Sequence, residues 1–206
     1  MHALPISFEV LNRLHPERQS LEAFIAQVFL KSYGAKVNHF AHTLLGWKDK
    51  AGQWVAALGY TPAEDNTLFV ENYGGKPMEI QVSERLGSAL NRQTLVEVGN
   101  LAATSAGAAR MLIANAVIHL HRQDFSWVVF TATRALLNSF DRLEVKAFEL
   151  GAADPVRLPD GGQSWGTYYD SRPCIMSGSI TLAYLGLMAK QNIQPVQMQG
   201  LGSVCY

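Results

Sequence analysis

The sequence predicts an α/β fold, and two observations carry this prediction. Between residues 94 and 151, stretches typical of strands alternate with stretches typical of helices. The chain has 206 residues, of which 48% are apolar, so it is long enough for one domain with a substantial core. We therefore expect a single α/β domain over residues 1–206.

The first half of the chain begins with an amphipathic helix. Apolar residues after Pro16 recur at the spacing of one helix face, which predicts one apolar stripe. They are Leu21, Phe24, Ile25, Val28 and Phe29. Gly34 is a typical helix end. Residues 54–60 are typical of a strand, the preceding KDKAG segment predicts a hairpin turn, and Pro77 predicts the start of a short helix.

The middle of the chain gives the clearest pattern. Its predicted elements are a strand at 94–103, a turn of small residues at 104–108, a helix at 109–122, a strand at 127–133, a helix at 135–143 and a strand at 145–151. The long helix is apolar on most sides, so we expect neighbouring elements to bury it. After residue 152, turn signals, an aromatic segment and an apolar run follow.

Composition argues against several classes of function. Lys plus Arg and Asp plus Glu both number 17, so the formal net charge is zero and gives no general attraction to nucleic acids or anionic lipids. Two cysteines, Cys174 and Cys205, make no disulfide framework. No secretory signal is visible, and the apolar stretch 180–189 is shorter than the roughly 20 residues of a spanning helix. We expect a cytoplasmic protein that binds no nucleic acid and does not insert into membranes.

The segment TSAGAAR, at 104–110, joins a predicted strand to the long helix. Its small side chains let a ligand approach the backbone, and free N–H groups at a helix start favour an anion such as a pyrophosphate. The alternative is a tight turn that needs Gly107 for packing. The segment has neither the phosphate-loop pattern with its lysine nor GxGxxG.

Two resemblances add to this reading. Thr104-x-x-Gly107-x-Ala109 is similar to the pyrophosphate loop of GNAT acyltransferases, with Thr104 in place of the usual Arg or Gln. Four separated blocks resemble, in one order, the bacterial family named thermostable hemolysin: VEVGNLAA, WVVFTATRALLNSFDRL, GAADPVRLP and WGTYYDSRPCIMSGSI. This resemblance implies a GNAT-like fold, similar also to acyl-homoserine-lactone synthases, with a mixed sheet that is splayed at its centre and flanked by helices.

The same resemblance implies an acyl thioester donor, carried by coenzyme A or by an acyl carrier protein. The strand before the turn would bind the donor's pantetheine through free backbone groups, and the turn would bind its pyrophosphate. Asn138 would meet the donor from the following helix, or would be an ordinary surface residue. The implied donor-binding residues are Leu101, Ala102, Ala103, Thr104, Gly107, Ala108, Ala109, Arg110 and Asn138.

Glu97 is the first candidate for catalysis. It would act as a general base for an amine acceptor or bind the acceptor's ammonium, and the alternative is a solvated strand carboxylate. Because side chains alternate along a strand, Glu97 should face away from Val96 and Val98, toward an acceptor cleft or toward solvent.

Three further residues complete the candidate catalytic set. Asn100 would orient the acceptor or cap the strand end. Tyr168 and Asp170 would line an acceptor pocket, or belong to a strand with aromatic packing and a turn. Phe140 stands near where the GNAT pattern has a Tyr that protonates the leaving thiolate, so that role is vacant or moved. A longer acyl donor than acetyl-coenzyme A remains open.

Other reactive side chains form no recognisable site. Cys174 has apolar neighbours, which favour an inert core thiol over a nucleophile. His39 and His42 are three residues apart, but the sequence has no Cys/His quartet and no HExxH motif, so we expect no metal site. No Gly-x-Ser-x-Gly elbow is present to support a lipase.

Three functions remain open at this point. The first is an acyltransferase that moves an acyl group to an amine-bearing small molecule. The second is a membrane-active hemolysin, as the family name suggests, and the third is a binding module that kept the fold and lost the chemistry. The fold alone does not decide between them. The protein could also form an oligomer.

Overall fold

The structure is a computed structural model that describes residues 7–143 and 145–189. It contains one seven-stranded sheet with the order β1-β2-β3-β4-β5-β7-β6. Only β4 and β5 are parallel, and the other neighbouring pairs are antiparallel, so the sheet is mixed. The strands are β1 (Ser7–Leu11), β2 (Thr43–Lys48), β3 (Trp54–Pro62), β4 (Leu95–Ala103), β5 (Trp127–Ala132), β6 (Phe148–Ala152) and β7 (Cys174–Ser179).

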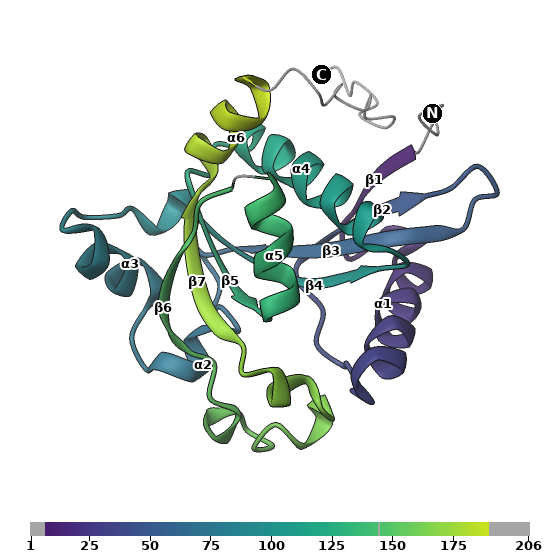
Figure 1. Ribbon diagram of the computed structural model, residues 1–206, viewed down its shortest axis with the longest axis horizontal. Helices are drawn as coiled ribbons and strands as arrows, with labels where there is room; N and C mark the ends of the chain where they lie inside the picture. Colours follow the sequence, from purple (N-terminus) through teal and green to yellow (C-terminus); the bar gives the residue numbers. More distant parts are fainter. Residues whose placement is uncertain (1–6, 144, 190–206) are drawn as a thin grey trace.

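Helices cover both faces of this sheet. They are α1 (Arg18–Tyr33), α2 (Glu71–Gly74), α3 (Met78–Leu86), α4 (Ala106–Arg122), α5 (Arg134–Leu143) and α6 (Ile180–Ala189). Alternate residues of β3 divide the core: Ala56 and Leu58 pack with α4, whereas Ala57 packs with α1. The helix α5 covers β5 on the α4 side and lies across the front of the sheet in Figure 1.

The sheet is splayed at its centre, as the resemblance implies. The strands β4 and β5 pair only from Leu95↔Trp127 to Val98↔Phe130. Beyond this point β4 continues along β3 to Ala103, while β5 continues along β7. The carboxyl ends of the two central strands therefore separate, and the backbone of residues 99–103 has no partner on β5.

A β-bulge lies at the point of separation. The register between β3 and β4 shifts between Ala57 and Gly59, so Asn100 and Leu101 both oppose Leu58. Asn100 has a positive φ of 52°. The bulge bends β4 and turns the Asn100 side chain across β3 toward the loop between α1 and β2.

Most of the predicted elements are present, with shifted ends. The long helix begins at Ala106 rather than at residue 109, because the Ser105 hydroxyl accepts the N–H of Ala108 and caps an earlier start. The strand predicted at 145–151 is β6, which begins only at Phe148. The edge strand β1 was not predicted, and the aromatic segment forms 3₁₀ turns, not a strand.

Candidate active site

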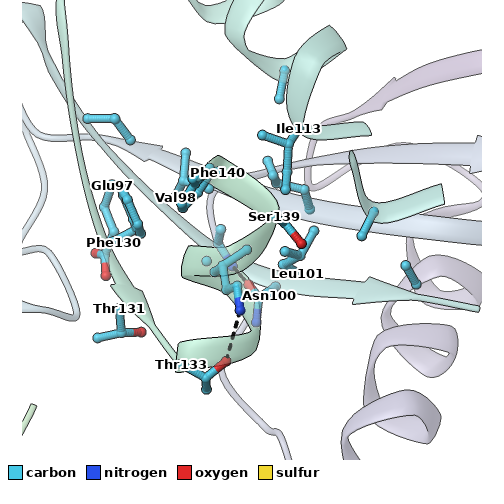
Figure 2. Close-up of a pocket in the computed structure, with 18 of the residues that line it drawn as sticks. Glu97, Val98, Asn100, Leu101, Ile113, Phe130, Thr131, Thr133, Ser139 and Phe140 are labelled. Atoms are coloured by element: carbon cyan, nitrogen blue, oxygen red, sulfur yellow. Dashed lines mark hydrogen bonds between the residues drawn. The ribbon is translucent and has the colours of Figure 1, made fainter. Parts of the chain in front are cut away.

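The splay opens into a cavity of about 420 Å³. Figure 2 shows labelled side chains of β4, β5, α4 and α5 around this space. Part of its lining is apolar and comes from α4 and α6, where Ala116, Leu120, Ile180 and Ala183 contribute. The cavity thus joins the free edge of β4 to an apolar interior.

Glu97 is a buried carboxyl at this cavity, and the solvated alternative is wrong. Only 9% of the residue is exposed. Its two carboxylate oxygens accept the backbone N–H groups of Phe69, at 2.6 Å, and Val70, at 3.1 Å. Val96 and Val98 pack in the core beneath α4, so the alternation placed Glu97 on the opposite face.

The surroundings of Glu97 suit proton transfer near neutral pH. Burial raises the pKa of Glu97 to about 7, although the N–H bonds from Phe69 and Val70 act in the opposite direction. A carboxyl with this pKa is present in both its charged and its neutral form at pH 7. It can therefore accept a proton and later release it.

An ion-pair network holds the loop that binds Glu97. The Arg92 guanidinium donates to Glu71, at 2.8 Å, and to the carbonyl oxygens of Ala63 and Asn66. Arg92 also pairs with Glu79 at the start of α3. These contacts fix the loop between β3 and α2, and with it the N–H groups that Glu97 accepts. Sequence reasoning missed Arg92 because its partners lie 13 to 29 residues away.

Asn100 is a positioning residue in the cavity wall. Its amide oxygen accepts the N–H of Ala41, at 2.9 Å, and its amide nitrogen donates to the carbonyl of His39, at 3.2 Å. A Cβ on Gly59 would come within 2.9 Å of the Asn100 oxygen and closer still to Ala41. Gly59 thus leaves room for Asn100 to anchor the loop that carries His39.

Tyr168 reaches the cavity, whereas Asp170 does not. Tyr168 is buried, and its hydroxyl donates to Thr131 at 3.4 Å. Its ring packs edge-on against Tyr33 in an aromatic cluster that also contains Trp165. Asp170 is exposed on a 3₁₀ turn and is outside the cavity lining.

The amino terminus of α4 opens at the cavity mouth. Ala103, Ser105, Ala106 and Ala109 line the cavity there. Among the described residues, the N–H groups of Ala106 and Gly107 have no acceptor. A Cβ on Gly107 would meet only the Ser105 hydroxyl, at an ordinary 3.7 Å, so the alternative in which packing requires Gly107 is wrong.

The other predicted donor-binding residues are divided between the cavity and its surroundings. Leu101 lines the cavity, while Ala102 packs on the opposite face with α1. Thr104 is exposed and donates its N–H to Val55. The remaining three, Ala108, Arg110 and Asn138, are half-buried or exposed and are not part of the lining.

The helix α5 closes the cavity opposite β4. Ser139 and Phe140 line it, and the Phe140 ring packs edge-on against Phe130 with centroids 5.0 Å apart. Phe140 brings no hydroxyl to this wall. Cys174 is not part of the lining, and burial and nearby Glu149 raise the pKa of its thiol, which disfavours a nucleophile.

His39 is a cavity residue that sequence reasoning considered only for metal binding. Its ring stacks on Phe69 with centroids 5.5 Å apart, and burial lowers its pKa. The described residues contain no group of three His, Cys, Asp or Glu side chains that could hold a metal ion. They also contain no helix long and apolar enough to cross a membrane.

Solved structures share this fold over most of their length. The acyl-homoserine-lactone synthase BjaI, solved with SAM and isopentyl-CoA, gives a TM-score of 0.63 at 11% identity and covers 96% of this chain and 95% of its own. TofI in its apo form gives a TM-score of 0.60 at 17% identity, and the match covers 88% of this chain and 97% of TofI. FeeM, an N-acyl amino acid synthase from uncultured soil microbes, gives a TM-score of 0.60 at 12% identity, and the match covers 91% of this chain and 97% of FeeM.

These likenesses confirm the α/β fold with its mixed, helix-flanked sheet, similar to that of acyl-homoserine-lactone synthases. No curated protein matches the sequence. The model of the thermostable hemolysin family matches residues 11–184, which is most of the chain. The protein therefore belongs to the thermostable hemolysin family.

Proposed function

We propose that this protein transfers an acyl group from a coenzyme A or carrier-protein thioester to the amine of a small molecule. One observation carries the proposal: a buried carboxyl, Glu97, faces a large cavity at the point where the two central strands separate. The names of the structural neighbours, which are acyl-homoserine-lactone synthases and an N-acyl amino acid synthase, support chemistry of this class.

The donor would enter at the free edge of β4. The unpaired backbone groups of residues 99–103 offer hydrogen bonds to the amides of a pantetheine arm. A pyrophosphate would lie at the amino terminus of α4, where the N–H groups of Ala106 and Gly107 are free among the described residues and the helix dipole favours an anion. Arg110, one turn into α4, would add positive charge.

The size of the cavity favours an acyl group longer than acetyl. A volume of about 420 Å³ with an apolar inner wall can bury a hydrocarbon chain, which gains about 0.8 kcal/mol for each buried CH₂. BjaI is described as dependent on coenzyme A and was solved with isopentyl-CoA. A branched or longer chain would occupy the space between α4 and α6.

The chemistry would be one acyl transfer. The amine nitrogen attacks the thioester carbonyl carbon, an N–C bond forms, the C–S bond breaks, and the proton lost by the amine passes to Glu97, directly or through a water. The thiolate leaves and takes up a proton from water, since Phe140 has none to give. Tyr168 and Asn100 would shape the space in which the acceptor meets the thioester.

Native mass spectrometry of the full chain tests the donor site. We expect a one-to-one complex with acyl-CoA or with acylated carrier protein, and tighter binding of octanoyl-CoA than of acetyl-CoA. Ala109→Trp places an indole in the cavity mouth and should weaken this binding at least tenfold. Ala189→Trp, at an exposed position outside the cavity lining, is the matched control. Failure of every acyl-CoA and acylated carrier to bind would contradict the proposal.

A further inference from the structure

A second, smaller pocket adjoins the main cavity. Its volume is about 80 Å³. Four residues line both spaces: His39, Thr61, Phe69 and Glu97. The small pocket is completed by Arg13, Phe40, His42, Asn66 and Thr67. Glu97 therefore stands where the small pocket meets the large apolar cavity.

Arg13 supplies a free positive charge to the small pocket. It lies in the turn between β1 and α1 and makes no hydrogen bond or ion pair with any residue that the structure describes. By contrast, Arg18 is held by Glu22 and by three carbonyl oxygens. Burial and the charge of Arg13 both lower the pKa of His39, as expected for a guanidinium near that ring.

The small pocket thus brings together a basic and an acidic side chain. Arg13 presents a guanidinium, which binds carboxylates in a planar, two-bonded geometry. Glu97 presents a carboxyl whose two oxygens already accept N–H groups from Phe69 and Val70, and which retains further acceptor capacity. The hydroxyl oxygen of Thr61 accepts the N–H of His42, which leaves its own hydrogen for a ligand.

We infer that the acceptor is an amino acid, with its carboxylate on Arg13 and its amine on Glu97. The inference deepens the proposed function and rests on it. Because Arg13 and Glu97 line the same pocket of about 80 Å³, a small ligand that carries a carboxylate and an amine close together can contact both side chains. An α- or β-amino acid has this spacing, whereas a simple amine leaves Arg13 unpaired.

The arrangement also orients the reaction. Arg13 lines only the small pocket, whereas Glu97 lines both spaces, so the carboxylate would lie away from the main cavity and the amine beside it. The nitrogen would then point toward the thioester carbonyl, and the side chain of the amino acid would extend past His39 and Phe69. Arg13 is a binding residue for the acceptor and takes no part in the proton transfer.

A binding experiment on the full chain tests this without requiring turnover. Ligand-observed NMR would measure a set of α-amino acids, each beside its carboxamide and its decarboxylated amine, together with 6-aminohexanoate and O-phosphoethanolamine. We expect at least one α- or β-amino acid to bind at least tenfold more tightly than its carboxamide and its amine. Equal or tighter binding of the carboxamide, the amine, 6-aminohexanoate or phosphoethanolamine would overturn the inference, as would the absence of binding by every amino acid.

Variants of Arg13 test whether its side chain contacts the carboxylate of the ligand. Arg13→Gln should weaken amino-acid binding at least tenfold and leave the affinity for the carboxamide unchanged, while Arg13→Lys should retain part of the preference. Arg157→Gln, at an exposed position outside both pockets, is the matched control. An Arg13→Gln protein that keeps the full preference overturns the inference. If the protein acylates amines but does not prefer those that carry a carboxylate, this inference alone is refuted. If it binds amino acids but consumes no thioester, only the proposed function is refuted.

Discussion

Glu97 shows how a residue's role depends on segments far from it in sequence. Strand alternation predicts which way Glu97 points, and the structure agrees. Its burial and its raised pKa come from the loop at Phe69 and Val70, which Arg92 holds in place. The sequence around residue 97 does not predict that this loop covers the side chain. The sequence alone therefore could not decide between a buried and a solvated carboxylate.

Replacing Glu97 with Gln should lower turnover and remove a pH dependence. Glu97 acts as a base only when ionised, so the wild-type rate should rise with pH and reach half its maximum near pH 7, the pKa of Glu97. Glu97→Gln should lose at least tenfold in turnover, about 1.4 kcal/mol of transition-state stabilisation, and lose this rise. Rate profiles from pH 5.5 to 8.5, with donor binding measured in parallel, check it. Wild-type turnover in the folded variant would leave Glu97 without a catalytic role.

The same residue should affect stability with a definite sign. The pKa of Glu97 is raised from 4.5 to about 7 in the folded chain, so between these values the folded state binds more protons than the unfolded state. The free energy of unfolding contributed by this group therefore falls as pH rises from about 4.5 to 7. Urea unfolding should show wild type losing stability relative to Glu97→Gln between pH 5 and pH 8. A difference that is constant or of opposite sign would contradict the burial of Glu97.

At the scale of elements, the separation of β4 from β5 and the start of α4 form the donor side of the site. Alternating strand and helix patterns predicted both elements. The start of α4 was placed three residues late because small residues such as Ala106 and Gly107 are typical of turns, and the Ser105 cap is a single side-chain contact. The prediction that the sheet is splayed rested on the family resemblance, because no local sequence pattern specifies where two strands stop pairing.

Gly107 offers a direct test of the α4 terminus. Gly107→Leu would cover the exposed N–H groups with a bulky side chain, and we expect at least tenfold weaker binding of coenzyme A by calorimetric titration. The fold should survive because a Cβ there meets only Ser105, at 3.7 Å. Gly186→Leu, at an exposed helical glycine of α6 where a Cβ meets nothing within 4 Å, is the control. Unchanged affinity in a folded Gly107→Leu protein would place the pyrophosphate elsewhere.

At the scale of the whole molecule, sequence reasoning found the central strands, the long helix α4 and the edge strand β6, but not the edge strand β1. The strand β1 takes its place by pairing with β2, and its five residues lie outside the alternating strand and helix patterns that revealed β6. A strand was one alternative for the aromatic segment, but it forms 3₁₀ turns beside the cavity, where Tyr33, Trp165 and Tyr168 pack together. Contacts between segments that are far apart in sequence therefore determine both this edge of the sheet and the acceptor side of the site.

The family name raises membrane lysis as a competing activity. The chain carries 17 basic and 17 acidic residues, so its net charge gives no attraction to anionic lipid. We expect purified protein to release no dye from anionic liposomes at concentrations that support acyl transfer. Dose-dependent release by the protein alone would favour the membrane-active function over the transferase.

The central claim is acyl transfer from a thioester to an amine in the cavity between β4 and β5. The most direct measurement uses a series of donors, with acyl groups from acetyl to dodecanoyl, each labelled with ¹³C at its carbonyl and carried by coenzyme A or by carrier protein. The label is then followed into the products that form with a mixture of amino acids and simple amines. We expect one labelled amide for each thiol released, at a rate at least tenfold lower in Glu97→Gln. Label recovered only as free fatty acid or as unreacted thioester would contradict it.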